Sequence, residues 1–469
     1  MSTTIEEQHP VHERLPLSRL IPLGLQHVLA MYAGAVVVPI IVGMAMKFTP
    51  AQMTMLVAAD LFTCGLATLF QCYGLGKSIG IRLPVILGVS FTAVGPMIAI
   101  GTGAGGVTDI YGAIIVSGLF VLFASYFFGK LVRFFPPVVT GTVVLIIGAS
   151  LVMVAVNNAG AGAFGPFAGF NPDGTNMYAK DFGDPKHLGL ALFTLVIILF
   201  ANKYFTGFLR ALSVLVGLLA GTIAGLFFGL TNLQPVADAS WVHFVTPFYF
   251  GMPTFSAGPI LTMCLVSLVG MVESTGVFFG LGKVCDKSIS EKDIGAGIRA
   301  EGVAQVLGGI FNSFPYSTFS QNVGLVALTG VRSRYVTVTA GVILMTLGLL
   351  PKFAALATVI PNSVLGGAMI ALFGIVAASG IRMLQQVDFS KTSNLLVVAC
   401  SISMGIGASV VTPLFAKMPE MFHILFGSGI VSGSVTAIIL NLFFNFDEVM
   451  GKSSEQIFNE VAHVDEGVF

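Results

Sequence analysis

Residues 315–330 read PYSTFSQNVGLVALTG and interrupt an apolar, membrane-length segment with Ser, Thr, Gln and Asn side chains. Non-helical backbone at membrane depth is tolerated only where it lines a cavity or is buried in protein. A second segment, RLPVILGVSFTAVGPMIAIG at 82–101, is broken in the same way by Pro, Gly, Ser90 and Thr92. A polar contact between helices could explain one such break. Two such breaks at corresponding places in two segments favour a ligand site that is assembled from interrupted spans.

The composition around these segments places the chain in a lipid bilayer. Of 469 residues, 55% are hydrophobic and 9% are charged, whereas soluble domains have roughly 25% charged residues. The formal net charge is zero, which gives no basic footprint for nucleic acid. The five cysteines form no CxxC pair, and no HExxH, GxSxG or zinc spacing occurs. We therefore expect no enzyme, metal, cofactor or nucleic-acid partner.

Apolar runs near the length that crosses a bilayer, about 20 residues, recur along the chain. They cover 20–43, 52–73, 107–128, 136–157, 188–202, 210–230, 257–282, 295–312, 335–351, 361–380, 394–412 and 428–446. With the segments near 83–101 and 313–330, these runs predict an all-α polytopic membrane protein of 14 transmembrane segments. With both termini cytoplasmic, sixteen Lys and Arg lie inside and five outside, and Arg299 lies near an inner end. Omitting either interrupted segment destroys that asymmetry.

The interrupted segments are the third and tenth spans, the spacing that a repeat of seven spans produces. An odd number of spans inverts the second copy, and inverted repeats with discontinuous helices are typical of secondary transporters. Buried polar side chains concentrate in the first part of each repeat. We therefore expect a tail at 1–16, a substrate-holding core at 17–133, 255–334 and 335–351, an inert scaffold at 134–254 and 352–447, and a tail at 448–469.

Three acidic residues lie deep in predicted spans: Asp60, Glu273 and Glu301. A charge at the bilayer centre costs on the order of 2.5–3.5 kcal/mol, so such residues usually mark a pathway. The alternative is a protonated carboxyl that binds a neighbouring helix, and we favour it for Asp60. Burial favours the protonated form, so Glu273, beside Ser274 and Thr275, could carry a proton. As a carboxylate it could accept two hydrogen bonds from a planar ligand.

Other polar and aromatic side chains complete the candidate site. Gln321 and Asn322 each offer a donor and an acceptor, which suits an amide-like edge. Phe91 could stack on a flat ring. His27 is the one histidine placed in the middle of a predicted span, and a single histidine cannot build a metal site. We expect His27 to support the site, with ligand contact or proton transfer as the alternative.

Several strings resemble the nucleobase–ascorbate transporter family, and within it bacterial xanthine permeases. Gln321–Gly330 resembles the family signature, and the family's other marked positions resemble Gln26-His27, Glu273-Ser-Thr-Gly276 and Ala300-Glu-Gly302. The likeness extends through GLQHVLAMYAGAVVVP, FFPPVVTG, GGIFNSFPY and IPNSVLGGAM.

The resemblance implies two inverted seven-span repeats divided into core and gate domains, with short strands of spans three and ten meeting at the midplane. It implies a homodimer in the plasma (inner) membrane that moves nucleobases together with protons. By the same resemblance, Glu273 and Gln321 bind the purine while Phe91 stacks on it. The nearby residues Ser90 and Ser320 assist in substrate binding. Support and proton coupling fall to His27, Glu301, Asn322, Gln26 and Thr275.

The substrate is predicted to be xanthine first, urate second and uracil third. Val277 stands where many purine-specific members of the family have aspartate, and Val323 replaces an asparagine frequent in some xanthine transporters. An anion exchanger or channel of similar topology is the alternative from another class. It would need a basic midplane, and no Lys or Arg lies at 85–100 or 314–329.

Overall fold

Long apolar helices account for most of the computed structural model. It describes residues 9–76, 78–131, 134–161, 167–170, 176–178, 181–415, 417–419, 422 and 426–451. The predicted C-terminal tail from 452 onward and residues 1–8 of the N-terminal tail lie outside these residues. The fold is mostly helical, as predicted.

The helices follow the apolar runs. In chain order the longer ones are α1 (Leu17–Ala45), α2 (Pro50–Cys72), α3 (Val94–Gly101), α4 (Gly106–Ala124), α6 (Pro137–Ala159), α7 (Pro185–Tyr204), α9 (Ser213–Phe227), α11 (Ala257–Val284), α12 (Glu291–Ile310), α13 (Ser320–Thr329), α14 (Arg334–Gly348), α15 (Pro351–Thr358), α16 (Asn362–Leu384), α17 (Thr392–Val410) and α19 (Gly429–Phe444). The shorter ones are η1 (Pro10–His12), η2 (Phe91–Ala93), η3 (Ser125–Phe127), α5 (Phe128–Leu131), α8 (Gly207–Ala211), α10 (Gln234–Asp238), η5 (Thr412–Phe415) and α20 (Phe446–Gly451).

Several of these helices can cross a membrane. Within the described residues, 8 helices are long and apolar enough, and α14 with α15 adds one if the pair counts as a span bent by 82°. The sequence predicts a single span at 335–351, whereas α14 ends at Gly348 and the chain turns into α15. The protein is therefore a multi-pass membrane protein.

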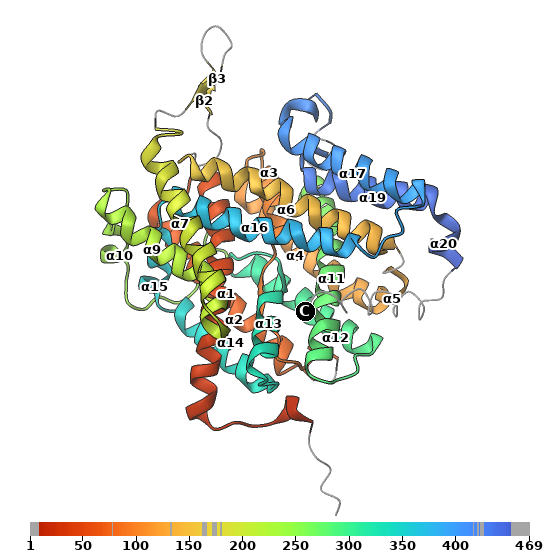
Figure 1. Ribbon diagram of the computed structural model, residues 1–469, viewed down its shortest axis with the longest axis horizontal. Coiled ribbons are helices and arrows are strands. Elements are labelled where there is room, and N and C mark those ends of the chain that lie inside the picture. The colour runs from red at the N-terminus through yellow and green to blue at the C-terminus, as the bar shows by residue number, and fades with distance from the viewer. Residues whose placement is uncertain are drawn as a thin grey trace, which may run out of the picture.

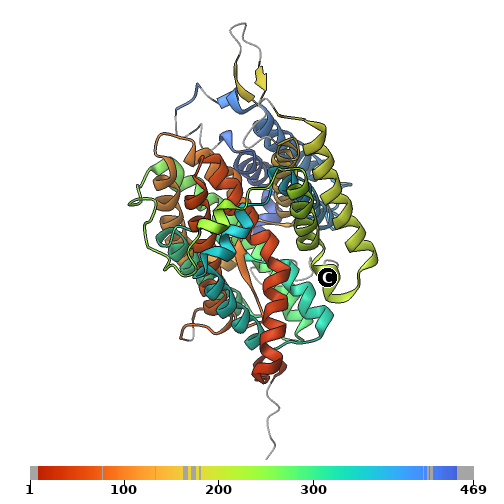
Figure 2. The same ribbon diagram turned by 90° about the vertical axis from the view of Figure 1, so that its left-hand side faces the viewer.

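The helices form two groups. One contains α1, α2, α4, α11, α12 and α14, and the other contains α6, α7, α9, α16, α17 and α19. Figure 1 shows α6 and α16 side by side across the middle of the second group. Figure 2 shows the N-terminal end of α1 at one end of the molecule and the hairpin of β2 (Phe167–Phe170) and β3 (Asn176–Tyr178) at the opposite end.

The helix pairs occur in matched sets. In the first group, α2 packs on α14 as α12 packs on α4, and α1 packs on α14 as α11 packs on α4. In the second, α7 packs on α9 and α16 as α17 packs on α19 and α6. In each matched set, a helix from the first half of the chain takes the place that a helix from the second half takes in the corresponding pair.

Local sequence features repeat in the same way. Both α2 and α12 begin with a capping box, formed by Thr49 with Gln52 and by Ser290 with Asp293. The crossings of both helices are close backbone contacts. A Cβ on Gly341 of α14 would lie 2.9 Å from the Gly65 carbonyl oxygen of α2. A Cβ on Gly302 of α12 would lie 3.0 Å from the Gly118 carbonyl oxygen of α4.

Two short strands join the interrupted segments. β1 (Leu87–Val89) pairs antiparallel with β4 (Tyr316–Thr318), with Gly88 opposite Ser317. The pairing is extended by Ser90 N–H donating to the Pro315 carbonyl oxygen at 2.9 Å. After β1 the chain turns into η2 and α3, and after β4 it turns into α13.

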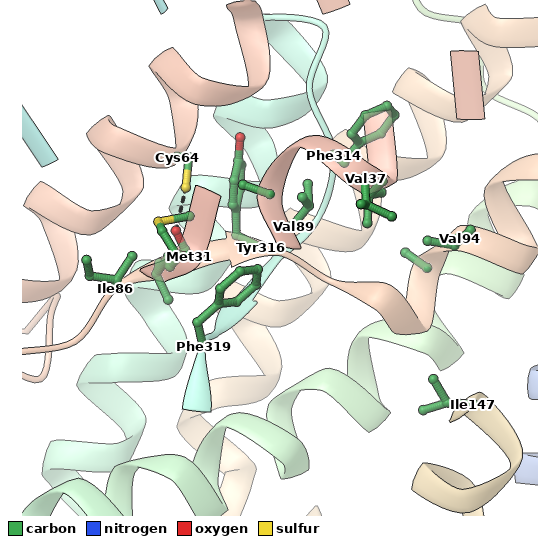
Figure 3. Packing of buried hydrophobic residues seen from close by; sticks show 14 of the residues in the cluster. Met31, Val37, Cys64, Ile86, Val89, Val94, Ile147, Phe314, Tyr316 and Phe319 are labelled. Atoms are coloured by element: carbon green, nitrogen blue, oxygen red, sulfur yellow. Dashed lines mark hydrogen bonds between the residues drawn. The ribbon is translucent and has the colours of Figure 1, made fainter. Parts of the chain in front are cut away.

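Side chains of α2 satisfy the free edge of this strand pair. The Leu87 carbonyl oxygen accepts from the Cys64 thiol at 2.6 Å, and the Leu87 N–H donates to Thr68 Oγ1 at 3.1 Å. Buried backbone groups without partners are costly, so α2 makes extended backbone possible inside the protein. Figure 3 shows the Phe319 ring directed toward the base of Tyr316, whose side chain extends away from that ring.

Candidate functional site

The predicted acid Glu273 lies where α11 meets both interrupted segments. Its carboxylate Oε2 accepts from Thr92 Oγ1 of η2 at 3.3 Å. The next residue, Ser274, accepts the backbone N–H of Thr318 in β4 at 3.2 Å through its hydroxyl oxygen. Glu273 is half-buried, whereas Ser274 is fully buried. The carboxyl is thus fixed beside the break in each segment.

A cluster of aromatic rings begins at Phe91, the residue before Thr92, which donates to this carboxyl. Phe91 of η2 is stacked with Phe319, with ring centroids 6.1 Å apart and an interplanar angle of 17°. Phe373 of α16 meets the Phe91 ring edge-on at 5.5 Å. Phe91 was expected from the sequence, whereas Phe319 and Phe373 were not. Phe319 lies inside the polar stretch, between Thr318 and Ser320, and its position there is the signal that could have found it.

The first turn of α13 is open. Ser320 and Gln321 are exposed, and Gly324 one turn later is exposed with no atom within 4 Å of an added Cβ. The N-cap residue of α13, Phe319, offers no side-chain cap. The first N–H groups of a helix have no partner within the helix and attract electronegative atoms. This turn therefore presents backbone donors together with the Gln321 amide.

His27 and Asn322 form a buried contact behind the open turn. Asn322 Nδ2 donates to the His27 carbonyl oxygen at 3.1 Å and lies 3.1 Å from His27 Nδ1. The contact joins α1 to α13 and fits a supporting role. Gln26 is half-buried on α1. The Thr275 hydroxyl donates to the Met271 carbonyl oxygen within α11 at 2.7 Å, so this bond stays in its own helix.

Glu301 holds strand β4 from the other side. Its Oε1 accepts from Thr318 Oγ1 at 2.8 Å, and the residue is 3% exposed. Thr318 thus connects α11 through its backbone and α12 through its side chain. Ser90 is buried at the end of β1. Glu273, Glu301 and Ser90 are therefore brought to one region by the strand pair.

Asp60 also contacts the β4 segment, at a separate place. Its Oδ1 accepts from the Ser313 hydroxyl at 2.7 Å and from the Tyr316 hydroxyl at 3.2 Å. This arrangement is a buried carboxyl bound to a neighbouring segment, which is the structural interpretation favoured for Asp60. Within the described residues, no group of three or more His, Cys, Asp and Glu could hold a metal ion.

The arrangement combines a carboxyl, an amide, an aromatic face and an open helix N-terminus at a break in the helical structure. Such groups can fix the polar edge and the face of a small flat molecule. Together with the multi-pass fold, they define a membrane permease. Residues 18–414 match the family model described as Permease family. The chain belongs to the nucleobase–ascorbate transporter family, which confirms the resemblance.

Curated relatives match most of the chain. The nucleobase transporter PlUacP of Paenibacillus larvae is 52% identical over 91% of this chain and 95% of its own length. The xanthine permease of Bacillus subtilis is 51% identical over 91% of this chain and 94% of its own length. The uric acid permease PucK of Bacillus subtilis is 51% identical over 91% and 95%, respectively. These relatives are transporters.

Solved structures share the fold. The transmembrane domain of the cyanobacterial bicarbonate transporter BicA has a TM-score of 0.58 and 17% identity, covering 88% of this chain and 99% of that chain. SLC26A9 has a TM-score of 0.55 and 12% identity, covering 92% of this chain and 66% of that chain.

Proposed function

We propose that the protein is a proton symporter for an oxidised purine, with xanthine as the first substrate and urate as the second. The placement of Glu273, Phe91 and Gln321 around one strand pair carries this proposal. Relatives at about half identity are named as nucleobase, xanthine and uric acid transporters, which supports the substrate class.

In this proposal the purine binds between α11, η2 and the first turn of α13. Xanthine presents adjacent N–H and C=O groups, which complement a carboxylate and an amide. Glu273 accepts from a ring N–H, and Gln321 pairs with the neighbouring polar edge. Phe91 stacks on the ring, and Ser320 and Ser90 assist from the ends of the two strands.

Coupling to protons is assigned to Glu273 and Glu301. Glu273 meets the substrate, and Glu301 contacts Thr318 in the strand that leads to Gln321. Protonation of either carboxyl turns one of its oxygens from a hydrogen-bond acceptor into a donor, and so changes its hydrogen bonds to Thr318 or to the substrate. His27, Asn322, Gln26 and Thr275 support the surrounding helices.

We infer fourteen crossings, in two inverted repeats. The eight long helices supply eight, and α9, α12, α14 and α19 add four. The strand–helix segments β1–α3 and β4–α13 add the last two. The matched helix pairs support the repeat. The group of α1, α2, α4, α11, α12 and α14, with the two strand–helix segments, forms the core, and the second helix group forms the gate.

Alternating access then moves the core against the gate. The assembly is proposed to be a homodimer in the plasma membrane with both termini in the cytoplasm.

Uptake of labelled xanthine, urate and uracil into cells that express the protein tests the proposal. Uptake of xanthine that urate inhibits more strongly than uracil, and that collapses when the proton gradient is removed, is the expected result. No uptake of any nucleobase contradicts the function. Uptake that does not depend on the proton gradient contradicts proton coupling but leaves nucleobase transport supported.

The likeness to the bicarbonate transporter BicA makes anion exchange the second candidate. The interrupted segments lack basic residues at 85–100 and 314–329, which disfavours it. Labelled bicarbonate and chloride, tested in the same cells, should not accumulate.

A further inference from the structure

A small cavity lies behind the strand pair, on the side of Glu301. Its volume is about 20 Å³, and the polar residues Ser90, Ser267, Glu301 and Gln305 line it. A cavity of at least ~10–15 Å³ can hold one water molecule when two to four polar partners surround it. The cavity therefore meets both the size and the polarity that a single bound water needs.

Hydrogen bonds orient the groups around the cavity. The Gln305 amide Nε2 donates to Ser117 Oγ at 2.6 Å and to Ser267 Oγ at 2.9 Å. Since both amide hydrogens are used, Gln305 Oε1 remains as an acceptor. The Ser267 oxygen receives one of these bonds, so its own hydrogen is available to donate. A molecule in the cavity thus meets a fixed acceptor and a donor.

The cavity matters for proton coupling because the Glu301 carboxyl lines it. Thr318 donates to Oε1 of its carboxylate, and the same carboxyl lines the cavity. The elements packed against α12 carry further titratable groups: Glu273, Cys264 and Lys283 on α11, Tyr316 on β4, Asp109 and Tyr111 on α4, Asp60, Cys64 and Cys72 on α2, and Tyr126 on η3. Since the hydroxyl of Tyr316 binds Asp60, it does not serve Glu301.

We propose that this cavity binds one structural water that donates a hydrogen bond to Glu301 and a second one to Gln305 Oε1, while Ser267 donates to the water. The water is thus a partner of the Glu301 carboxylate, and Gln305 and Ser267 are positioning residues that hold it. This inference rests on the proposed proton coupling. Loss of the water leaves the charged form of Glu301 less favoured, so protonation persists to higher pH.

Gly270 provides the means to displace the water. It lines the cavity, and a Cβ added there meets no atom within 4 Å. Gly270→Ala therefore places a methyl group in open space on α11 without a clash. Gly407→Ala is the matched control, because Gly407 is also half-exposed on a long helix and its added Cβ also meets nothing within 4 Å.

The experiment compares purified wild type, Gly270→Ala, Ser267→Ala and Gly407→Ala in proteoliposomes. Proton-driven xanthine accumulation is measured across a pH series, and xanthine exchange is measured without a gradient. In Gly270→Ala and Ser267→Ala, the pH of half-maximal accumulation should rise by about one unit, the size expected for one hydrogen bond to a charged group. Exchange should stay within about twofold of wild type, and Gly407→Ala should match wild type in both measurements.

Unchanged pH profiles in both Gly270→Ala and Ser267→Ala overturn the bound water. If Gly270→Ala does not fold, the profile of Ser267→Ala decides alone. A wild type that exchanges xanthine but shows no dependence on the proton gradient overturns the proposed symport, and the inference falls with it.

Discussion

The Glu273 carboxyl lies where lipid tails offer no hydrogen-bond donors, so the protein itself must stabilise its charged form. Thr92 donates to it from one interrupted segment, and its neighbour Ser274 binds the backbone of the other. An ionised carboxyl needs such donors, because burial without them costs several kcal/mol. The position is therefore suited to a group that meets a polar ligand and changes its charge during a cycle.

Substitution of Glu273 tests the residue directly. Glu273→Gln keeps the shape but removes the charge, so the hydrogen bonds to a purine N–H weaken by about 1.5–3 kcal/mol, or roughly 10- to 150-fold in affinity. Xanthine uptake should fall accordingly, and accumulation driven by the proton gradient should disappear. The measurement is the initial rate and the steady-state level of labelled xanthine, with and without a gradient.

Glu291→Gln is the control for this substitution, since Glu291 is exposed in the first turn of α12. Its uptake should equal that of wild type. Full gradient-driven accumulation by Glu273→Gln would remove Glu273 from the coupling mechanism.

The strand pair is the element that decides where the site residues lie. β1 and β4 are each 3 residues long, and α2 side chains satisfy the outer edge of β1. Because each strand turns directly into a helix, a small displacement of the pair moves Phe91 and Gln321 together. Gly88 is central to the pair, since the Phe319 ring packs against its backbone, and a Cβ there would lie 2.7 Å from Phe319 Cε2.

Gly88→Ala should therefore disturb the whole element. Overpacking of this kind costs about 1–3 kcal/mol, and displacement of Phe319 also moves its stacking partner Phe91. We expect a lower thermal unfolding temperature in detergent and at least tenfold slower xanthine uptake. Gly189→Ala, on α7 with no atom within 4 Å of its added Cβ, should change neither quantity. Normal stability and uptake in Gly88→Ala would show that the position of the Phe319 ring does not depend on its contact with Gly88.

The two helix groups set the behaviour of the whole molecule. Each is held together by close helix crossings, whereas the contacts between the groups include α3 with α19 and Phe91 with Phe373. In the proposed alternating access, movement of the core against the gate must break these contacts or slide one side past the other. A covalent bond across the boundary should therefore stop transport, and a bond within one group should not.

A pair of cysteines tests this at the boundary. A Cβ at Gly95 of α3 would lie 3.8 Å from Ser428 Oγ, just before α19. A cysteine at 428 has its sulfur near that oxygen position, so the two side chains are close enough to test for a disulfide, which needs Cβ atoms about 3.5–4.5 Å apart. Oxidised Gly95→Cys/Ser428→Cys should lose more than about 90% of its xanthine uptake, and reductant should restore it, because a single stable cross-link removes the relative motion that alternating access requires.

Ser150→Cys/Ser409→Cys is the control within the gate, where the two serine oxygens lie 3.1 Å apart. Its uptake should survive oxidation. Transport that continues through the cross-linked core–gate pair would contradict movement between the two groups.

Hydropathy and charge by themselves determined the class of protein, the order of the apolar segments and the two places where they break. Lipid imposes these features locally, because each spanning segment must be apolar. A polar residue inside a span must therefore face the protein interior or a cavity. The same logic singled out Glu273, Glu301 and Gln321 as candidates, whereas Phe91 was chosen for its ability to stack on a flat ring.

Only the tertiary structure decided which residues meet. The pairing of β1 with β4, the edge of Phe373 against Phe91 and the bond from Thr318 to Glu301 join segments far apart in the chain. Such contacts depend on how helices cross, and no local pattern encodes a crossing. For this reason the sequence predicts a polar site in a bilayer, while packing determines its neighbours and the cavity behind it.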